Sequence, residues 1–289
     1  MGYYKQLGLE KEPFSTSPDP DFFYLSKEHD VALTNVLIEL YLRRGLSVVL
    51  GDIGTGKTTL SRKLVQCLKE RGDFVLNILL DPVFKNERHF LMSLMSNFGP
   101  EAEKLAPSAG MKDLSAIDLK KMLQRYLYEQ CVAQKKTVVV IIDEAQKLSR
   151  SSLEMLRVML NYETNDSKLL QLVLLGQLEL QQKIKSMPNF YDRISFKFRL
   201  NPLGIQETRD MIDFRLRQAG YGGVRHLFMD GAVEVIHEVS SGYPRKVTQM
   251  CHRALKTAIM KNRWAVCELT ARELVEEDTR AGWLNPIHH

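Results

Sequence analysis

The stretch VVLGDIGTGKTTLSRKL, Val48–Leu64, places three glycines and a lysine between a short apolar run and an amphipathic one. The apolar run LSVVL (46–50) has the length and the β-branched content of a buried strand. After the glycines, Leu60, Leu64 and Leu68 recur at the spacing of one face of a helix. A strand, a glycine-rich turn and a helix in this order predict a loop that binds phosphate.

The turn matches the Walker A pattern of P-loop proteins, G-x-x-x-x-G-K-[ST]. Glycines let backbone amides curl around phosphate oxygens, and the start of the next helix adds a favourable dipole. Lys57 is predicted to reach the β- and γ-phosphates, and Thr58 to hold Mg²⁺ through its hydroxyl. A plain glycine-rich turn is the alternative, and the flanking strand and helix argue against it. The predicted nucleotide-binding residues are Gly51, Asp52, Ile53, Gly54, Thr55, Gly56, Lys57, Thr58 and Thr59.

A second motif, the Walker B pattern, lies in VVVIIDEAQ, where an apolar run ends in two carboxylates. In open α/β sheets, ligands bind at the carboxyl ends of the strands. Asp143 is predicted to bind Mg²⁺, directly or through water. Glu144 is predicted to orient and deprotonate the attacking water. The alternative is a solvated strand end, and the glycine loop upstream favours the catalytic pair.

The remaining pattern predicts an α/β fold followed by a helical region. Strands are expected at FVLNILL (74–80), TVVVIID (137–143), LLQLVLLG (169–176) and ISFKFRL (194–200), with helices between them. This alternation predicts a mostly parallel sheet covered on both faces, a three-layer αβα P-loop core. After Pro202 only helical periodicity remains, in about four helices. The predicted divisions are an extended segment 1–27, a core 28–203 and a small helical lid domain 204–289.

Composition limits the classes of protein. At 289 residues with 44% hydrophobic and 26% charged residues, the chain is typical of a globular protein. A net charge of +5 neither requires nor excludes nucleic acid. The four cysteines form no CxxC pair, which favours a reducing cytoplasm. No apolar run approaches the ~20 residues that cross a bilayer. We therefore expect no transmembrane segment, and any role at a membrane is expected to run through a partner.

On these motifs the chain resembles the AAA+ ATPases of the general secretion pathway protein A group, which includes ATPases of MSHA-type pilus biogenesis and exopolysaccharide export. An extra strand between the two Walker motifs also favours the AAA+ branch over kinase-like proteins. The resemblance covers nearly the whole chain. It rests on the opening YYKQLGLEKEPFSTSPDPDFFYLSKEHDVAL, on the two motifs, and on LRVMLNYETNDSKLLQLVLLGQLEL, RISFKFRLNPL and GYPRKV.

The resemblance implies three further site residues. Gln177, at the end of the fourth predicted strand, matches the polar residue that senses the γ-phosphate, where many AAA+ proteins have Asn or Thr. Arg193 matches the arginine that one subunit contributes to the nucleotide of the next. Arg245 matches the second sensor arginine of the lid. The alternatives are a surface arginine before an edge strand for Arg193 and a solvated helix face for Arg245.

The N-terminal aromatic segment has two readings as well. By resemblance, residues 22–25 pack by the adenine, and the alternative is plain core. Preference for adenine follows from the resemblance alone; no guanine-reading N-K-x-D motif is evident.

The expected function is hydrolysis of ATP with Mg²⁺ in a homo-oligomer that energises or assembles a secretion, pilus or export machine. The expected place is the cytoplasm, peripheral at the inner membrane through protein components of that machine. Secretion members of the group often continue into a membrane helix and a periplasmic wall-binding domain. This sequence contains neither, which favours the shorter members.

A basic stretch of the sequence is the observation that favours an alternative function. Six basic residues and no acidic one lie between Tyr243 and Arg263, and an acidic run follows from Glu268 to Asp278. Two solvated faces that partly neutralise each other are the plain interpretation. The alternative function is an ATP-switched DNA-binding regulator of a transposition-type system, in which the basic face meets DNA. A third reading is a scaffold that binds ATP and hardly turns it over.

Overall fold

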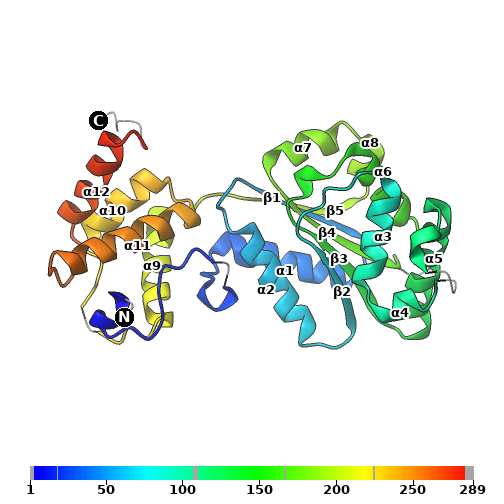
Figure 1. Ribbon diagram of the computed structural model, residues 1–289, viewed down its shortest axis with the longest axis horizontal. Coiled ribbons are helices and arrows are strands. Elements are labelled where there is room, and N and C mark those ends of the chain that lie inside the picture. Colours follow the sequence, from blue (N-terminus) through cyan, green and yellow to red (C-terminus); the bar gives the residue numbers. More distant parts are fainter. Residues whose placement is uncertain (1–2, 18, 107–109, 166, 224, 284–289) are drawn as a thin grey trace. The chain divides into compact units, whose positions relative to one another are not determined.

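The computed structural model describes residues 3–17, 19–106, 110–165, 167–223 and 225–283, and Figure 1 shows its helices and strands. Pro18, in the predicted extended segment 1–27, and residues 107–109 lie outside the described residues. The chain forms two compact units. The α/β unit comprises Lys27–Ile53 and Leu60–Leu200, and the helical unit comprises Met1–Ser26, Gly54–Thr59 and Asn201–His289.

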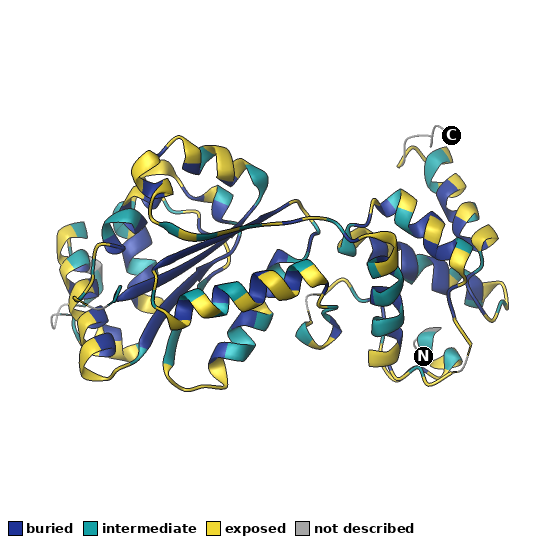
Figure 2. Ribbon diagram, turned by 180° about the vertical axis from the view of Figure 1, so that it is seen from behind, coloured by how far each residue is buried: buried dark blue, intermediate teal, exposed yellow. Residues whose placement is uncertain are grey.

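The α/β unit is built on a parallel sheet in the order β2-β3-β4-β1-β5, as the alternating pattern predicted. The central strands are buried along their whole length, because both faces of the sheet are covered (Figure 2). The last strand lies at an edge and alternates between partly buried and exposed residues. The strands are β1 (Leu46–Gly51), β2 (Phe74–Leu79), β3 (Thr137–Ile142), β4 (Leu170–Gly176) and β5 (Ile194–Leu200).

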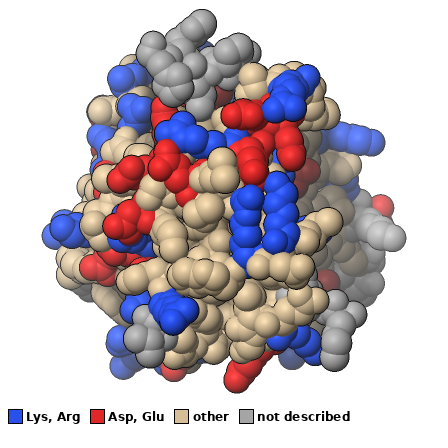
Figure 3. All heavy atoms as spheres, turned by 90° about the vertical axis from the view of Figure 1, so that its left-hand side faces the viewer, with Lys and Arg blue, Asp and Glu red and all other residues tan. Residues whose placement is uncertain are grey.

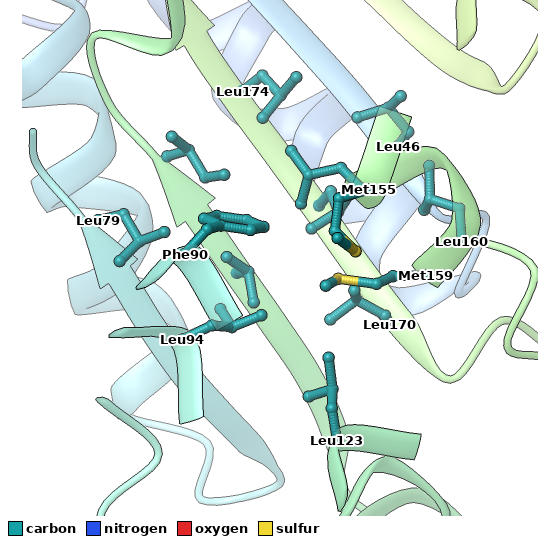
Figure 4. Close-up of a cluster of buried hydrophobic side chains, with 14 of the residues drawn as sticks. Leu46, Leu79, Phe90, Leu94, Leu123, Met155, Met159, Leu160, Leu170 and Leu174 are labelled. Carbon is teal, nitrogen blue, oxygen red and sulfur yellow. The ribbon is translucent and has the colours of Figure 1, made fainter. Parts of the chain in front are cut away.

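Helices cover both faces of this sheet and so form the predicted three layers. On one face, Leu33 of α1 (Lys27–Tyr41) and Leu64 of α2 (Lys57–Lys69) gather over Val49 and Val173. On the other face, side chains from three helices form a close-packed core against the strands (Figure 4). These helices are α3 (Glu87–Asn97), α5 (Ala116–Tyr128) and α6 (Arg150–Met159).

Shorter elements complete the α/β unit. The stretch 99–115 contains two single turns, and α5 continues into a π-helical turn. The short elements are α4 (Pro100–Glu103), η3 (Met111–Asp113), η4 (Glu129–Ala133), η5 (Ala145–Lys147), α7 (Leu178–Lys185) and α8 (Pro188–Tyr191).

The helical unit contains the four helices predicted after Pro202. They share one apolar core, which also takes in the N-terminal segment through Leu9, Phe14 and Phe22. Phe14 meets Phe228 edge-to-face, with ring centroids 5.5 Å apart. The elements are η1 (Tyr3–Leu7), η2 (Pro20–Phe22), α9 (Ile205–Gln218), α10 (Asp230–Ser240), α11 (Pro244–Met260) and α12 (Glu268–Arg280).

One arginine fastens the N-terminal segment to this unit. The guanidinium of Arg215, on α9, donates hydrogen bonds to the carbonyls of Pro13 (2.7 Å), Ser15 (2.8 Å) and Phe22 (3.2 Å). It also lies over the Phe22 ring, 5.5 Å from the centroid. Burial lowers the pKa of Arg215 to about 10, so the residue stays protonated at neutral pH. Arg215 thus adds three hydrogen bonds to the apolar contacts that hold this proline-rich segment.

Across the described residues, no helix combines the length and the apolar character that a membrane span requires.

Candidate nucleotide-binding site

The strand register brings three predicted site segments to one edge of the sheet. In the α/β unit, Leu50 of β1 pairs with Gly176 of β4, and Leu174 of β4 pairs with Ile142 of β3. These strands are parallel, so the residues that follow them lie at the same, carboxyl edge. Asp52 and Ile53 after β1, Asp143 and Glu144 after β3, and Gln177 after β4 therefore share this edge.

The acidic pair has an unusual backbone. Asp143 is 2% exposed, and its Oδ1 accepts a hydrogen bond from the Glu144 amide at 2.9 Å. Glu144 adopts a left-handed conformation, with φ 51° and ψ 36°. This conformation costs a non-glycine residue about 1–3 kcal/mol. Among the described residues Glu144, the predicted catalytic base, shares it with Arg43, Lys135, Ser241 and Asn262.

Two glutamines hold the carboxylate of Glu144. Gln146 donates from Nε2 to Glu144 Oε2 at 2.7 Å, and its own Oε1 accepts from the Gln177 backbone amide at 3.0 Å. The side-chain Nε2 of Gln177 also lies 3.5 Å from Glu144 Oε2. The structure thus brings Glu144 and Gln177, two of the predicted site residues, together. The sequence analysis did not predict Gln146. The only indication in the sequence is its position two residues after Glu144, in the motif DEAQ.

The glycine loop has the backbone that its sequence requires. Gly54 and Gly56 have φ of 85° and 97°, where a side chain is strained. Thr55 is fully buried and Lys57 is 6% exposed at the first position of α2. Thr58 and Thr59 follow in the first turn of this helix, whose amides point toward its amino end. A buried lysine and left-handed glycines at a helix start fit the phosphates of a nucleotide.

Arg245 lies against this loop within the helical unit. Its backbone amide donates to the Gly54 carbonyl at 3.3 Å, and a Cβ on Gly54 would lie 3.2 Å from the Cβ of Arg245. Arg245 is the second residue of α11, and its side chain is exposed. The predicted second sensor and the predicted phosphate loop therefore meet through their backbones.

The start of α11 is set by a glycine. Gly242 has φ 69°, and its carbonyl accepts from the Leu203 amide at 2.9 Å. A Cβ at this position would lie 2.0 Å from the Leu203 carbonyl oxygen, far inside contact distance. Pro244 then occupies the first turn of the helix, as prolines often do. This geometry fixes the place of Arg245.

Arg193 is not brought to the carboxyl edge. It precedes β5, whose first residue Ile194 pairs with Leu46, the first residue of β1. Arg193 is exposed and lies at the amino edge of the sheet, a six-residue strand or about 20 Å from the end of β1. Its side chain is too short to span that distance to Asp143 or Glu144 of the same chain.

The aromatic segment, residues 22–25, lies in the helical unit, as does the basic stretch. Phe22 is buried in its core, Tyr24 lies 5.9 Å from the ring of Phe214, and Leu25 is exposed.

Acidic residues of α12 form ion pairs with three of the six basic residues between Tyr243 and Arg263. Arg253 contacts Asp278 at 2.7 Å, while Lys261 and Arg263 contact Glu273 at 2.6 and 3.3 Å. Acidic and basic side chains are interleaved across the face drawn in Figure 3. The interpretation of mutually neutralising faces is supported by these pairs.

Comparison with known proteins agrees with this fold. Residues 41–184 match the AAA domain family. The ORC2 protein of Aeropyrum pernix, solved with ADPNP and ADP, superimposes with a TM-score of 0.64 at 19% identity, over 88% of this chain and 67% of that one. Together with the parallel sheet and the helices that follow it, these matches identify the fold as that of AAA+ P-loop proteins.

Within that class the chain is related to General secretion pathway protein A of Aeromonas hydrophila. The two are 36% identical over 261 residues, which is 90% of this chain and 45% of the relative. The chain thus spans less than half the length of that protein. It is also 22% identical, over 93% of its length and 72% of the relative, to an uncharacterized HTH-type transcriptional regulator of Methanocaldococcus jannaschii.

Proposed function

We propose that this chain binds ATP and hydrolyses it with Mg²⁺. The observation that carries the proposal is Glu144, a carboxylate in a left-handed backbone at the carboxyl end of β3, hydrogen-bonded beside Gln177. A general base needs a fixed position more than it needs an unusual environment. The restrained Glu144 supports that role.

Each predicted residue has a defined part in this reaction. Lys57 and the amides of residues 51–59 bind the phosphates. Thr58 and Asp143 offer a hydroxyl and a carboxylate oxygen, which are ligands that Mg²⁺ prefers, and the ion would neutralise phosphate charge. Glu144 takes a proton from water as the water oxygen bonds to the γ-phosphorus and ADP leaves with the bridging oxygen.

Three further assignments belong to the proposal. Gln177 donates to the γ-phosphate. Arg245, in the lid domain 204–289, acts as the second sensor, which its contact with Gly54 supports. The segment 1–27 packs near the nucleotide; its attachment to α9 through Arg215 supports a common movement with the lid.

We propose that a second copy of the chain completes the site. Arg193 lies at the sheet edge away from the carboxylates of its own chain, which supports a role toward the nucleotide of a neighbour. Such an arginine stabilises charge in the transition state and raises turnover by about 10³–10⁵ in related reactions. Hydrolysis then depends on oligomerisation.

The relative named for general secretion supports a class of partner. We propose that the oligomer energises or assembles a secretion, pilus or export machine and contacts its protein components at the cytoplasmic face of the inner membrane. A DNA-binding regulator is the second candidate, favoured by the relative of HTH type. The ion pairs with α12 argue against it, because they occupy half of the basic stretch.

The proposal is tested by Glu144→Gln. We expect ATP affinity within about threefold of wild type and a turnover about 10²–10⁴ times lower, the usual contribution of a positioned base. Glu179→Gln, an exposed carboxylate on α7, is the matched control and should turn over normally. Wild-type turnover in Glu144→Gln would remove Glu144 from the mechanism. Salt-sensitive binding of duplex DNA, with turnover unaffected by Glu144→Gln, would favour the regulator.

A further inference from the structure

We infer that Gln146 is a positioning residue for hydrolysis, because its side-chain amide holds the Glu144 carboxylate and ties it to the backbone of Gln177. The inference rests on the proposed function in one respect: it takes Glu144 as the group that accepts the proton from water.

The two ends of the Gln146 amide are used for two different partners. Nε2 donates to Glu144 Oε2 at 2.7 Å, and Oε1 accepts from the Gln177 amide at 3.0 Å. The opposite orientation would set an oxygen against a carboxylate and an NH₂ group against an N–H. Only one orientation therefore satisfies both partners. This fixes the Gln146 side chain, and the side chain in turn fixes the carboxylate.

The contacts are also one-sided on Glu144. Both hydrogen bonds described for its carboxylate, from Gln146 and Gln177, end on Oε2. Oε1 is the oxygen that these bonds leave for the water. A hydrogen bond of normal length from a half-buried amide to a carboxylate is among the stronger ones in proteins.

The segment that carries Gln146 is braced from α7. Lys183 Nζ donates to the carbonyls of Gln146 at 2.6 Å and Leu148 at 2.7 Å. Gly176 leaves room for the side chain, since a Cβ there would lie 3.3 Å from Gln146 Oε1. Gln177 is the residue that caps α7, so a shift of Gln177 on the γ-phosphate would reach Glu144 through Gln146. The arrangement couples sensing of the phosphate to the placement of the base.

The first test is Gln146→Met, which keeps the length of the side chain and removes both polar ends. We expect kcat to fall about 10- to 100-fold, because small displacements of a catalytic group cost about that much, with KM and the Kd for ATP within about twofold. Gln182→Met, at an exposed position on α7, is the matched control and should keep wild-type kcat. Thermal unfolding of each variant reports folding separately.

The second test separates positioning from a merely structural role. In the Glu144→Gln background, Gln146→Met should cause no further loss in single-turnover hydrolysis, because residues that act as a unit are not additive. An equal loss in both backgrounds would overturn the inference. Gln146→Glu keeps the volume but sets a second carboxylate against Glu144, so it should also lose kcat, and it decides the matter where Gln146→Met does not fold.

The two proposals fail in different ways. Wild-type kcat in Gln146→Met and Gln146→Glu, with Glu144→Gln inactive, overturns the role of Gln146 and leaves the proposed function standing. Loss of ATP affinity instead of kcat overturns it as well. Normal turnover in Glu144→Gln contradicts the proposed function itself.

Discussion

At the scale of single residues, Gly242 shows how the absence of one side chain positions another, that of the candidate sensor Arg245. Its left-handed φ and its contact with the Leu203 carbonyl leave no room for a Cβ, and the helix that carries Arg245 begins two residues later. Glycine is needed here for space and for conformation together.

We predict that Gly242→Ala destabilises the protein by about 3 kcal/mol or more, the sum of a left-handed alanine and a backbone clash. Denaturant unfolding measures this loss. Gly222→Ala is the control, since a Cβ there meets nothing within 4 Å; it should change stability by about 0.5 kcal/mol at most. Equal stability of the two variants would show that the chain near Leu203 relaxes.

Lys57 is the second residue with a prediction at this scale, which concerns its proposed contact with the phosphates of ATP. It is 6% exposed at the start of α2, where a triphosphate would offer its counter-charge. Lys57→Ala should weaken ATP binding about 30-fold or more, the cost of losing a buried charged partner. Isothermal titration measures it, with the exposed Lys185→Ala as control. Unchanged affinity in Lys57→Ala would contradict the phosphate role.

At the scale of elements, the N-terminal segment depends on α9. Arg215→Met removes the donor to three carbonyls while keeping the apolar stem. We expect faster amide exchange in residues 9–22 and a loss of about 2–4 kcal/mol, because partly buried carbonyls lose charged donors. The control is Arg217→Met, at an exposed position two residues further along α9. Unchanged exchange in the segment would mean that its other contacts, the apolar core and the backbone bonds to Ala219, hold it without Arg215.

The ion pairs of Glu273 on α12 with Lys261 and Arg263, which follow α11, lead to a prediction about pH dependence. A hydrogen bond from Lys261 is the main cause that lowers the pKa of Glu273, with Arg263 adding to it. A carboxyl whose pKa falls on folding contributes stability above its ordinary pKa of 4.5, and this contribution is lost as the pH falls below that value.

Glu273→Gln should therefore have a lower melting temperature than wild type at pH 7, and the difference should shrink as the pH falls below 4.5. Lys261→Met should show the same convergence, because it removes the other half of the pair. A difference that persists undiminished at pH 3 would assign the effect to packing and not to charge.

At the scale of the whole molecule, the proposal that Arg193 serves the nucleotide of a neighbouring copy implies that hydrolysis is a property of the oligomer. We predict that Arg193→Ala is nearly inactive and that its activity returns when it is mixed with Glu144→Gln. In the mixture, intact sites of the first variant meet arginines of the second. Specific activity of wild type should rise with protein concentration. Mixtures as inactive as their components would contradict a shared site, and Lys185→Ala should need no complementation.

Much of the fold was predictable because the relevant forces act locally. The five strands, the helices between them and the four helices of the second unit follow from apolar periodicity, which each segment carries in itself. The glycine loop and the acidic pair could be predicted for the same reason, because each motif consists of residues that are close together in the sequence. Gln177 and Arg245 were found only through resemblance.

The sequence by itself thus determined the α/β architecture, the phosphate loop and the carboxylates, since burial period and backbone freedom are properties of short stretches. Only the tertiary structure decided that Gln146 reaches Gln177 across 31 positions and that Arg215 reaches Pro13 across 202. It also decided that residues of the basic stretch form ion pairs with acidic residues of α12. Such meetings depend on how elements pack against one another, and side chains far apart in the chain meet only after that packing has formed.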